Sequence, residues 1–599
     1  MAITWANILE WKTRPLDEIA QELLEASQGL REAHEKGQDD LKAVQSEGEA
    51  VTAMRATTIT NLASLERALT NVNGALMAIE GARDGVATVM SNINNLQAYA
   101  SANNCTILKD GSVVGEGSRT QRGGKSSARL DIEQGIEDIV KQADQVDTDL
   151  YHALQDINND SYTDGDWAEN KVIGVPDFPQ PNWSPSQNAA WWNSLTEDRK
   201  QFLMDHRPDD IRHLDGLPAY ARDRANRLAL DGYFDDRGNY HKGALADAEQ
   251  EIKDAQDEYD AARKHPSAYE PRSGHMGSEE RAAKEKLERA LEKYEDLRAI
   301  RRQTNDFERT KSGLPPAYLL DFNYDEKYHR TTAIVSAGNP DTATHVSTLV
   351  PGIGTNVRGD LGYYMDFNDR LRKQTRHAGV DPNNVATISY LGYVAPKNQG
   401  ADIVQASDIG YADRAAPKLA RFEEGLRASG NATGHSFTNT LIGHSYGSTT
   451  SGKSMTLVAP GTVDRFIMCG SPGAGADTID AYNVSPKHVY VSSIPTSDAV
   501  QDLNTFTPSG FGSDPRYLDG ITHLSGDVTN SENYVPPRVP PIDDNPLVHQ
   551  AYRFVHALDH HMAYFDEGTR TSQDFANIVA GGNQTTDEEW AAIQEERGK

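Results

Sequence analysis

The sequence predicts an all-α N-terminal region followed by an α/β domain whose mostly parallel sheet is flanked by helices. Up to about residue 100, apolar residues recur every three or four positions, as on one face of a helix. From residue 316, short apolar runs alternate with helical stretches, which is typical of repeated strand–helix units. Because 599 residues exceed what one hydrophobic core usually holds, we expect several domains.

Composition narrows the possible partners and compartments. The net charge of −30 argues against nucleic acid, because binding by counterion release needs clustered Lys and Arg. The N-terminal stretch lacks the apolar core of a signal peptide, and no apolar run is long enough for a transmembrane segment. We therefore expect a cytoplasmic protein or one exported without an ordinary signal peptide. Cys469 lies in an apolar run, where a reduced, buried thiol is expected.

The first domain, residues 1–104, is expected to be a helical hairpin. Its two amphipathic runs are separated by the helix-breaking stretch Ser46–Glu49. The apolar stripe of this hairpin needs a partner, either another helix of the chain or another protein. The stripe residues are Leu16, Ile19, Leu23, Ala26, Leu30 and Ala33, then Val51, Met54, Thr58, Leu62, Leu65, Leu69, Val72, Leu76, Ile79, Val86, Met90 and Ile93.

Four further segments follow. Residues 105–170 are expected to form a β-hairpin turning at Asp110-Gly111, an amphipathic helix and a linker. Residues 171–315 form a helical segment before the sheet, and their charged insertion at 244–303 has the pattern of a solvent-exposed helical hairpin that acts as a spacer or arm. Residues 316–585 make the α/β domain, and 586–599 a tail.

A candidate nucleophile lies in "LIGHSYGS", Leu441–Ser448. Gly443-x-Ser445-x-Gly447 has the spacing of a nucleophile elbow, in which a sharp strand-to-helix turn exposes a serine hydroxyl. Such a pentapeptide is common by chance in a glycine-rich chain, so its context decides. An apolar strand pattern precedes it and small residues follow it, as a tightly packed turn requires. The context supports Ser445 as a nucleophile.

A serine nucleophile needs a base and an acid, and in enzymes with this elbow the chain order is Ser, Asp or Glu, then His. Asp498 follows the apolar run "HVYVSSI", with Asp502 as a nearby rival. The C-terminal part offers several candidate bases, of which His561 is favoured and His560 is the main rival. The four histidines there are His549, His556, His560 and His561.

The N–H groups of an oxyanion hole are expected from Tyr446, the residue after the nucleophile, and from Ile353 in the loop "PGIGT". That loop is a poor dinucleotide fingerprint, since Val357 stands where the third glycine belongs. The run Asp559–His561 is a poor metal site, because adjacent residues lie on different faces of a helix. No metal or organic cofactor is therefore implied.

Several stretches together resemble a known family. "VPGIGT", "ISYLGYVAP", "LIGHSYGS", "HHMAYFD…SQDFANIVAGG" and residues Ala189–Leu230 are similar to an actinobacterial α/β-hydrolase family of mostly uncharacterised members, over about residues 170–582. The resemblance implies an α/β hydrolase fold with Ser445 as nucleophile and Asp498 as acid. It places the base at the start of a His-x-x-Tyr segment, which here is His561 to Tyr564.

The N-terminal hairpin is similar to the WXG-type helical modules of type VII secretion substrates. Its turn has Ser46-Glu47-Gly48 where those modules have Trp-x-Gly. The resemblance implies export without a cleavable signal peptide and a helical partner protein for the hairpin.

These observations favour a serine hydrolase that acts on lipid- or acyl-ester-like substrates through an acyl-enzyme. A peptidase, an amidase or an acyltransferase would use the same three residues. A secreted effector or interaction protein with a degenerate site is the alternative of a different class. Residues Trp191–Leu230 are expected either to shape the site or only to pack beside the sheet, and no chemistry is assigned to their Arg222 and Asn226.

Overall fold

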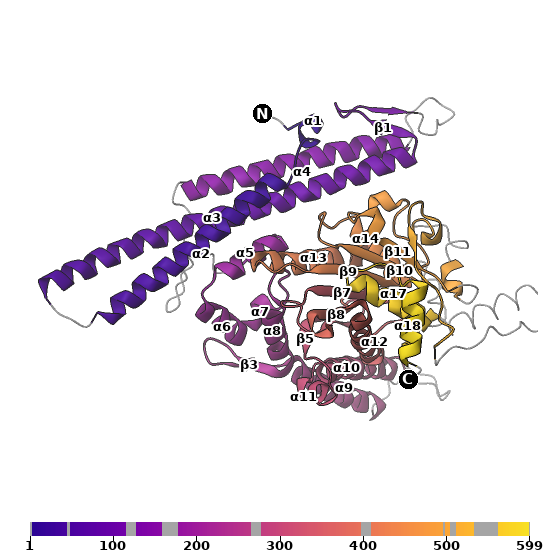
Figure 1. The fold of residues 1–599 in the computed structure, drawn as a ribbon. Helices are drawn as coiled ribbons and strands as arrows, with labels where there is room; N and C mark the ends of the chain where they lie inside the picture. The colour runs from indigo at the N-terminus through magenta and orange to yellow at the C-terminus, as the bar shows by residue number, and fades with distance from the viewer. Residues whose placement is uncertain are drawn as a thin grey trace, which may run out of the picture.

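The computed structural model describes residues 3–44, 48–115, 127–158, 178–264, 277–396, 409–494, 498–502, 511–531 and 561–597. Long N-terminal helices lie together across one side of an α/β domain, and the far ends of two of them project beyond it (Figure 1). Within the described residues, every helix is too short or too polar to cross a membrane.

The N-terminal helices pack against one another and form a bundle. Helices α2 and α3 run antiparallel, since Ser27 donates to Asn73 at 2.5 Å and Gly37 faces Leu62. Helix α4 packs along the other half of α3 and buries part of the apolar stripe, Ile93 included, whereas Ile19 and Met54 remain exposed. The elements are α1 (Trp5–Ile8), α2 (Arg14–Ala43), α3 (Glu49–Ala102), β1 (Cys105–Ile107), β2 (Val113–Gly115) and α4 (Ser127–Asn158).

A compact helical segment connects this bundle to the sheet. Buried Trp191, Leu203 and Ile211 pack with Leu76 and Met77 of α3, which joins the segment to the bundle in one core. Its elements are α5 (Pro185–Ser194), α6 (Glu197–His206), α7 (Pro208–Ile211), α8 (Ala219–Asp231), β3 (Gly232–Phe234), β4 (Tyr240–Lys242), α9 (Ala244–Lys264), α10 (Ser278–Gln303) and α11 (Asp306–Lys311).

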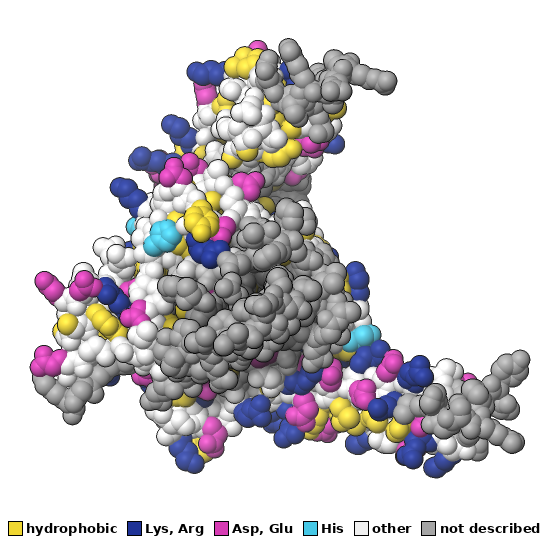
Figure 2. Space-filling view, turned by 90° about the vertical axis from the view of Figure 1, so that its right-hand side faces the viewer, with side chains coloured by type: hydrophobic (Ala, Val, Ile, Leu, Met, Phe, Trp, Pro, Cys, Tyr) yellow, Lys and Arg dark blue, Asp and Glu magenta, His cyan; other side chains and the backbone are white. Residues whose placement is uncertain are grey.

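Helices α9 and α10 correspond to the charged insertion, but the solvated arm expected there describes only part of it. Leu297 and Ile300 of α10 are buried in the main core, and the Arg358 N–H donates to Asp296 at 2.9 Å. The sequence misleads here because charged residues on the outer face dominate the composition of both helices. On the face in Figure 2, the described basic and acidic side chains are interspersed rather than gathered by sign.

Eight strands of the described residues form one sheet in the order β12-β11-β10-β9-β7-β8-β6-β5. Pairing is parallel from β12 to β8, while β6 pairs antiparallel with both β8 and β5. The strands are β5 (Ala317–Asp325), β6 (Arg330–Ala337), β7 (His345–Val350), β8 (Val385–Leu391), β9 (Thr438–His444), β10 (Arg465–Cys469), β11 (Val489–Ser492) and β12 (Thr522–His523).

Helices cover both faces of the sheet. The core on one face takes side chains from α10, α12 and α17, and the core on the other from α13 and α14. The helices are α12 (Val357–Gln374), α13 (Gly410–Ala432), α14 (Tyr446–Met455), α17 (Arg570–Val579) and α18 (Asp587–Arg597). The short 3-10 turns are η1 (Thr375–Ala378), η2 (Pro382–Asn384), η4 (Ile479–Ala481), η5 (Pro486–His488), η6 (Ala499–Asp502), η7 (Pro515–Tyr517) and η8 (Ala563–Phe565).

Side chains of α8 form hydrogen bonds with backbone groups of β5, the strand at one end of the sheet. The Leu319 N–H donates to Asp223 at 2.7 Å, and the Asn226 amide donates to the Leu320 carbonyl at 3.0 Å. Arg227 of the same helix also donates to a β5 carbonyl, at 2.6 Å. The polar residues of α8 therefore satisfy strand groups that have no neighbouring strand.

Candidate active site

Ser445 lies at a sharp turn between β9 and α14. Its backbone has φ 57° and ψ −134°, a conformation that costs a non-glycine residue free energy and persists where the surroundings enforce it. A Cβ on Gly443 would lie 2.5 Å from the Cα of Ser448, and one on Gly447 would lie 2.2 Å from the Val350 carbonyl oxygen. Glycine is therefore required on both sides of Ser445, as the motif predicts.

Asp498 and His561 form a buried pair. The Nδ1–H of His561 donates to Oδ1 of Asp498 at 2.9 Å, and the Val500 N–H donates to the same oxygen at 3.1 Å. Burial alone would raise the pKa of Asp498, but His561 and the hydroxyl of Tyr564 outweigh it and hold that pKa below its ordinary value. The carboxylate is thus kept ionised beside the imidazole.

Backbone contacts bring Ser445 next to this pair. The Ser445 N–H donates to the Cys469 carbonyl at 3.0 Å, and the following residue, Gly470, adopts φ +54°. A Cβ on Gly470 would lie 2.9 Å from both Oδ2 of Asp498 and Cε1 of His561. Nε2 of His561 is buried and finds no hydrogen-bond partner in the described parts of the chain. A free nitrogen in this place suits the acceptance of a proton.

His444 holds the backbone of His561 in place by a hydrogen bond, a role that sequence reasoning missed. Its Nε2–H donates to the backbone carbonyl of His561 at 2.9 Å, and the two rings lie 4.6 Å apart between centroids. Burial, with a smaller effect of His561, lowers the pKa of His444 to about 3. His444 is therefore neutral at ordinary pH and fixes the segment that carries His561. A histidine between the motif residues gives no sequence signal of such a contact.

The loop after β7 lies against Ser445, where the sequence predicts part of an oxyanion hole. A Cβ on Gly352 would lie 2.5 Å from the Cβ and 2.8 Å from the Oγ of Ser445. The next residue, Ile353, packs against an apolar cluster that contains Tyr446 and Phe511. The Gly354 N–H donates to the Pro396 carbonyl at 2.7 Å, which fixes the loop. Both predicted donors thus belong to segments next to Ser445.

Several rival residues lie outside the described part. This holds for His549, His556 and His560, and the side chain of Asp502 is likewise not described. The choice of His561 over His560 therefore stays a prediction. Among the described residues, no three His, Cys, Asp or Glu side chains are grouped so as to hold a metal ion.

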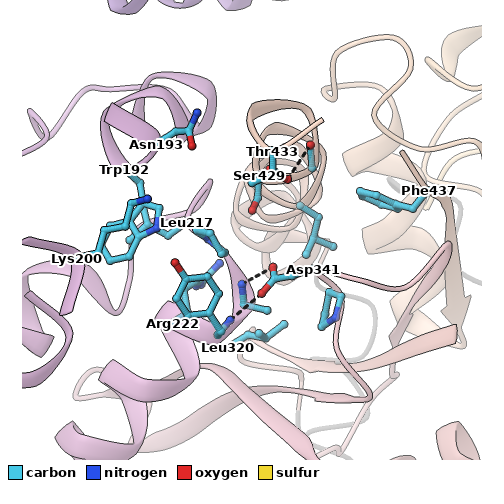
Figure 3. A pocket seen from close by; sticks show the side chains of 17 residues that line it. Trp192, Asn193, Lys200, Leu217, Arg222, Leu320, Asp341, Ser429, Thr433 and Phe437 are labelled. Carbon is cyan, nitrogen blue, oxygen red and sulfur yellow. Dashed lines mark hydrogen bonds between the residues drawn. The ribbon is translucent and has the colours of Figure 1, made fainter. Parts of the chain in front are cut away.

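The segment Trp191–Leu230 lies near the amino ends of strands β7 and β9, whereas Ser445 follows the carboxyl end of β9. With α13 it encloses a cavity of about 150 Å³. Figure 3 shows Trp192 and Arg222 on one side of this cavity, facing Thr433, the residue that follows α13. Asp341, which precedes β7, closes the cavity and accepts the Ala219 N–H at 2.7 Å. Because Ser445 follows the opposite, carboxyl end of β9, this segment does not line the candidate active site.

Comparisons with known proteins agree with this architecture. A family model described as "Alpha/beta hydrolase" matches residues 327–508, a stretch that includes Ser445 and Asp498. Two uncharacterized proteins from two strains of Mycobacterium tuberculosis are each 26% identical over 322 residues, which are 53% of this chain and 44% of theirs. The chain thus spans less than half the length of these relatives.

Among solved structures, the poly(3-hydroxybutyrate) depolymerase LpqC from Bordetella parapertussis is 12% identical, over 46% of this chain and 92% of its own, with a TM-score of 0.22. The family match and the sheet confirm the predicted fold class. The C-terminal part of the chain has the α/β hydrolase fold, and a mainly helical region with two short β-hairpins precedes it.

Proposed function

We propose that this protein is a serine hydrolase that cleaves lipid- or acyl-ester-like substrates with Ser445 as nucleophile, His561 as base and Asp498 as acid. The observation that carries the proposal is the buried 2.9 Å hydrogen bond between His561 and Asp498, formed next to the strained turn at Ser445. A base oriented by a carboxylate beside such a serine is the arrangement that acyl transfer requires.

In the first half-reaction, Nε2 of His561 accepts the proton of the Ser445 hydroxyl while Asp498 holds the opposite ring nitrogen. The serine oxygen attacks the carbonyl carbon of the ester. The N–H groups of Tyr446 and Ile353 stabilise the negative charge that develops on the carbonyl oxygen. His561 then gives its proton to the leaving alcohol, which leaves an acyl group on Ser445.

In the second half-reaction, His561 removes a proton from water, which attacks the acyl-enzyme. The tetrahedral intermediate collapses, the carboxylic acid departs and Ser445 recovers its proton from His561. Every step uses only groups of this chain, the substrate and water.

An apolar wall beside the turn supports an acyl substrate. Ala412, Tyr446 and Phe511 form a buried cluster, against which Ile353 packs. Because Ala412, Tyr446 and Phe511 are themselves buried, the partly buried Ile353 of the oxyanion loop is the residue that the hydrocarbon part of a bound ester would contact. The Tyr446 hydroxyl accepts the Ala412 N–H at 3.1 Å, which fixes that ring.

The first test is labelling with a fluorophosphonate probe, which reacts with activated serines. We expect the wild type to be labelled. Labelling should be lost in Ser445→Ala and sharply reduced in His561→Ala. The matched control is Ser454→Ala, which removes another buried hydroxyl from the helix that follows the turn. His560→Ala distinguishes the two adjacent histidines. Failure of the folded wild type to react would contradict the proposal.

The second test separates ester hydrolysis from related reactions. Nitrophenyl esters of graded acyl length are compared with the corresponding anilides, with and without an added alcohol acceptor. We expect turnover of esters. Turnover of anilides alone would replace the esterase with an amidase or peptidase, and transfer of the acyl group to the added alcohol would indicate an acyltransferase.

A further inference from the structure

Tyr564 is a buried residue of the same short turn that follows His561. Its hydroxyl donates to Oδ2 of Asp498 at 2.9 Å. The phenol oxygen of Tyr564 accepts the Ile494 N–H at 3.0 Å and the Gln501 side-chain amide at 3.2 Å. Two donors on the phenol oxygen leave its own proton directed to the carboxylate. The hydroxyl is therefore fixed from three sides.

Tyr564 and His561 hold opposite oxygens of the same carboxylate. Oδ1 of Asp498 accepts from His561 and from the Val500 N–H, whereas Oδ2 accepts from Tyr564. A carboxylate anchored at one oxygen only can turn about its Cβ–Cγ bond, because this torsion is soft. Such a turn would carry Oδ1 out of line with the imidazole N–H. The Tyr564 contact opposes it.

We propose that Tyr564 is a positioning residue, which fixes the Asp498 carboxylate so that Oδ1 remains aligned with Nδ1 of His561. This inference rests on the proposed function of the site. Tyr564 does not touch the reacting atoms in this scheme; it acts through Asp498.

The electrostatics of the contact agree with this role. Burial, together with Asp498, raises the pKa of Tyr564 well above its ordinary value, so the phenol remains a donor. Without that donor the carboxylate charge is less stabilised and attracts the proton on His561 more strongly. The acid limb of the activity profile should then move to higher pH.

The experiment replaces Tyr564 by Phe, which keeps the ring and removes only the hydroxyl. Tyr482→Phe is the matched control, since Tyr482 is also buried in this domain and its hydroxyl donates to the Ala474 carbonyl at 2.6 Å. kcat, KM and the pH dependence of kcat/KM are measured on the full chain with a nitrophenyl ester. Ser445→Ala is assayed in parallel.

For Tyr564→Phe we expect kcat to fall about 10-fold, the effect of losing a hydrogen bond to a charged group. KM should stay within about twofold of the wild type, because the hydroxyl lies behind Asp498 as seen from His561. The acid limb should move to higher pH, while Tyr482→Phe keeps the wild-type profile. A wild-type kcat and pH profile in Tyr564→Phe, or an equal loss in Tyr482→Phe, would overturn the positioning role.

The outcomes separate this inference from the proposed function. Ester hydrolysis that persists in Ser445→Ala would overturn the proposed function. A second readout needs no turnover: the proton NMR resonance of the Nδ1–H in the His561–Asp498 hydrogen bond. It should shift or broaden in Tyr564→Phe and remain in Tyr482→Phe. An unchanged resonance in Tyr564→Phe would reject the positioning role even if the enzyme's substrate stays unidentified.

Discussion

The side-chain amide of Asn95 donates a hydrogen bond to the backbone carbonyl of Thr456, 2.7 Å away. Asn95 lies on α3 of the N-terminal bundle, and Thr456 caps the carboxyl end of α14, whose first residue follows Ser445. The hydroxyl of Ser91 donates to the same carbonyl at 2.9 Å. The last carbonyls of a helix lack partners within it, so the bundle supplies them for the helix behind the candidate nucleophile.

Replacing Asn95 by Ala should loosen the carboxyl end of α14. Loss of one partly buried hydrogen bond costs about 1 kcal/mol, so the amides around Thr456 should exchange with solvent about fivefold faster. Hydrogen–deuterium exchange with mass spectrometry measures this directly. Asn92→Ala is the matched control, because Asn92 donates to Gln142 within the bundle at 2.9 Å. Equal exchange of α14 in both variants would contradict the predicted link.

Gly470→Ala should inactivate the site without unfolding the domain. The new methyl group would lie 2.9 Å from Asp498 and from His561, and the backbone there has φ +54°. Displacing Asp498 and His561 by up to about 1 Å should slow fluorophosphonate labelling about 100-fold. The rate of labelling, with circular dichroism as the check on folding, measures the effect.

Gly379→Ala is the control for backbone strain. Gly379 has φ +79° but no atom within 4 Å of the position of a Cβ. An alanine at positive φ costs about 1 kcal/mol in either place. Only Gly470→Ala should therefore lose labelling, and parallel losses in both variants would assign the effect to strain alone.

Glu423→Gln should stabilise the protein more at high pH than at low pH. Burial raises the pKa of Glu423 from 4.5 to about 7, so the folded state favours the protonated carboxyl. The stability it contributes is complete below pH 4.5 and is lost as the pH rises through about 7. The difference between the pKa of 4.5 in the unfolded state and about 7 in the folded state corresponds to a loss of about 3 kcal/mol of stability by pH 8. Glutamine, which does not ionise, should restore this stability.

Urea unfolding of the wild type and of Glu423→Gln at pH 5 and pH 8 measures this difference. Glu308→Gln is the control, since Glu308 is exposed on α11. The stability gain of Glu423→Gln over the wild type should grow with pH, whereas that of Glu308→Gln should stay constant. A constant gain for Glu423→Gln would contradict the raised pKa.

Asp498→Asn should show the opposite pH dependence. The pKa of Asp498 in the folded protein lies below its ordinary value of 3.8, so its ionised form contributes stability above about pH 4. That contribution is lost as the pH falls through the lower, folded pKa. The variant should therefore be less stable than the wild type at pH 6 and approach it toward pH 3, as measured by denaturant unfolding. A stability deficit that stays constant from pH 6 to pH 3 would contradict the lowered pKa.

The local geometry at Ser445 was predictable because its cause is local. Gly443 and Gly447 are required by the turn itself, and the strand before them shows in the apolar run. Asp498 was selected from its place after a strand, and its role as the acid stays a prediction. The selection of His561 needed a resemblance to known sequences, because four histidines within thirteen residues have equivalent local surroundings in the sequence.

Contacts between distant segments could not be predicted in the same way. Tyr564 meets Asp498 across 66 residues, and Asn95 meets Thr456 across 361. A polar residue such as Asn95 on an amphipathic helix has the pattern of a solvent-facing position. Only the packing of α3 on the α/β domain turns it into an interface residue. The burial of one end of α10 could not be predicted either, because Leu297 and Ile300 are few among many charged residues in the sequence of that helix.

The cover that α8 places over β5 also bears on how this protein behaves at high concentration. An open strand at the end of a sheet is a template on which a second molecule can add its own strand. Because Asp223 and Asn226 already bind backbone groups in the first half of β5, fewer of its groups are free to pair with an added strand. At the opposite end, β12 has only two residues, too few to seed such growth. Among the described strands, both end strands thus offer little free backbone for strand addition.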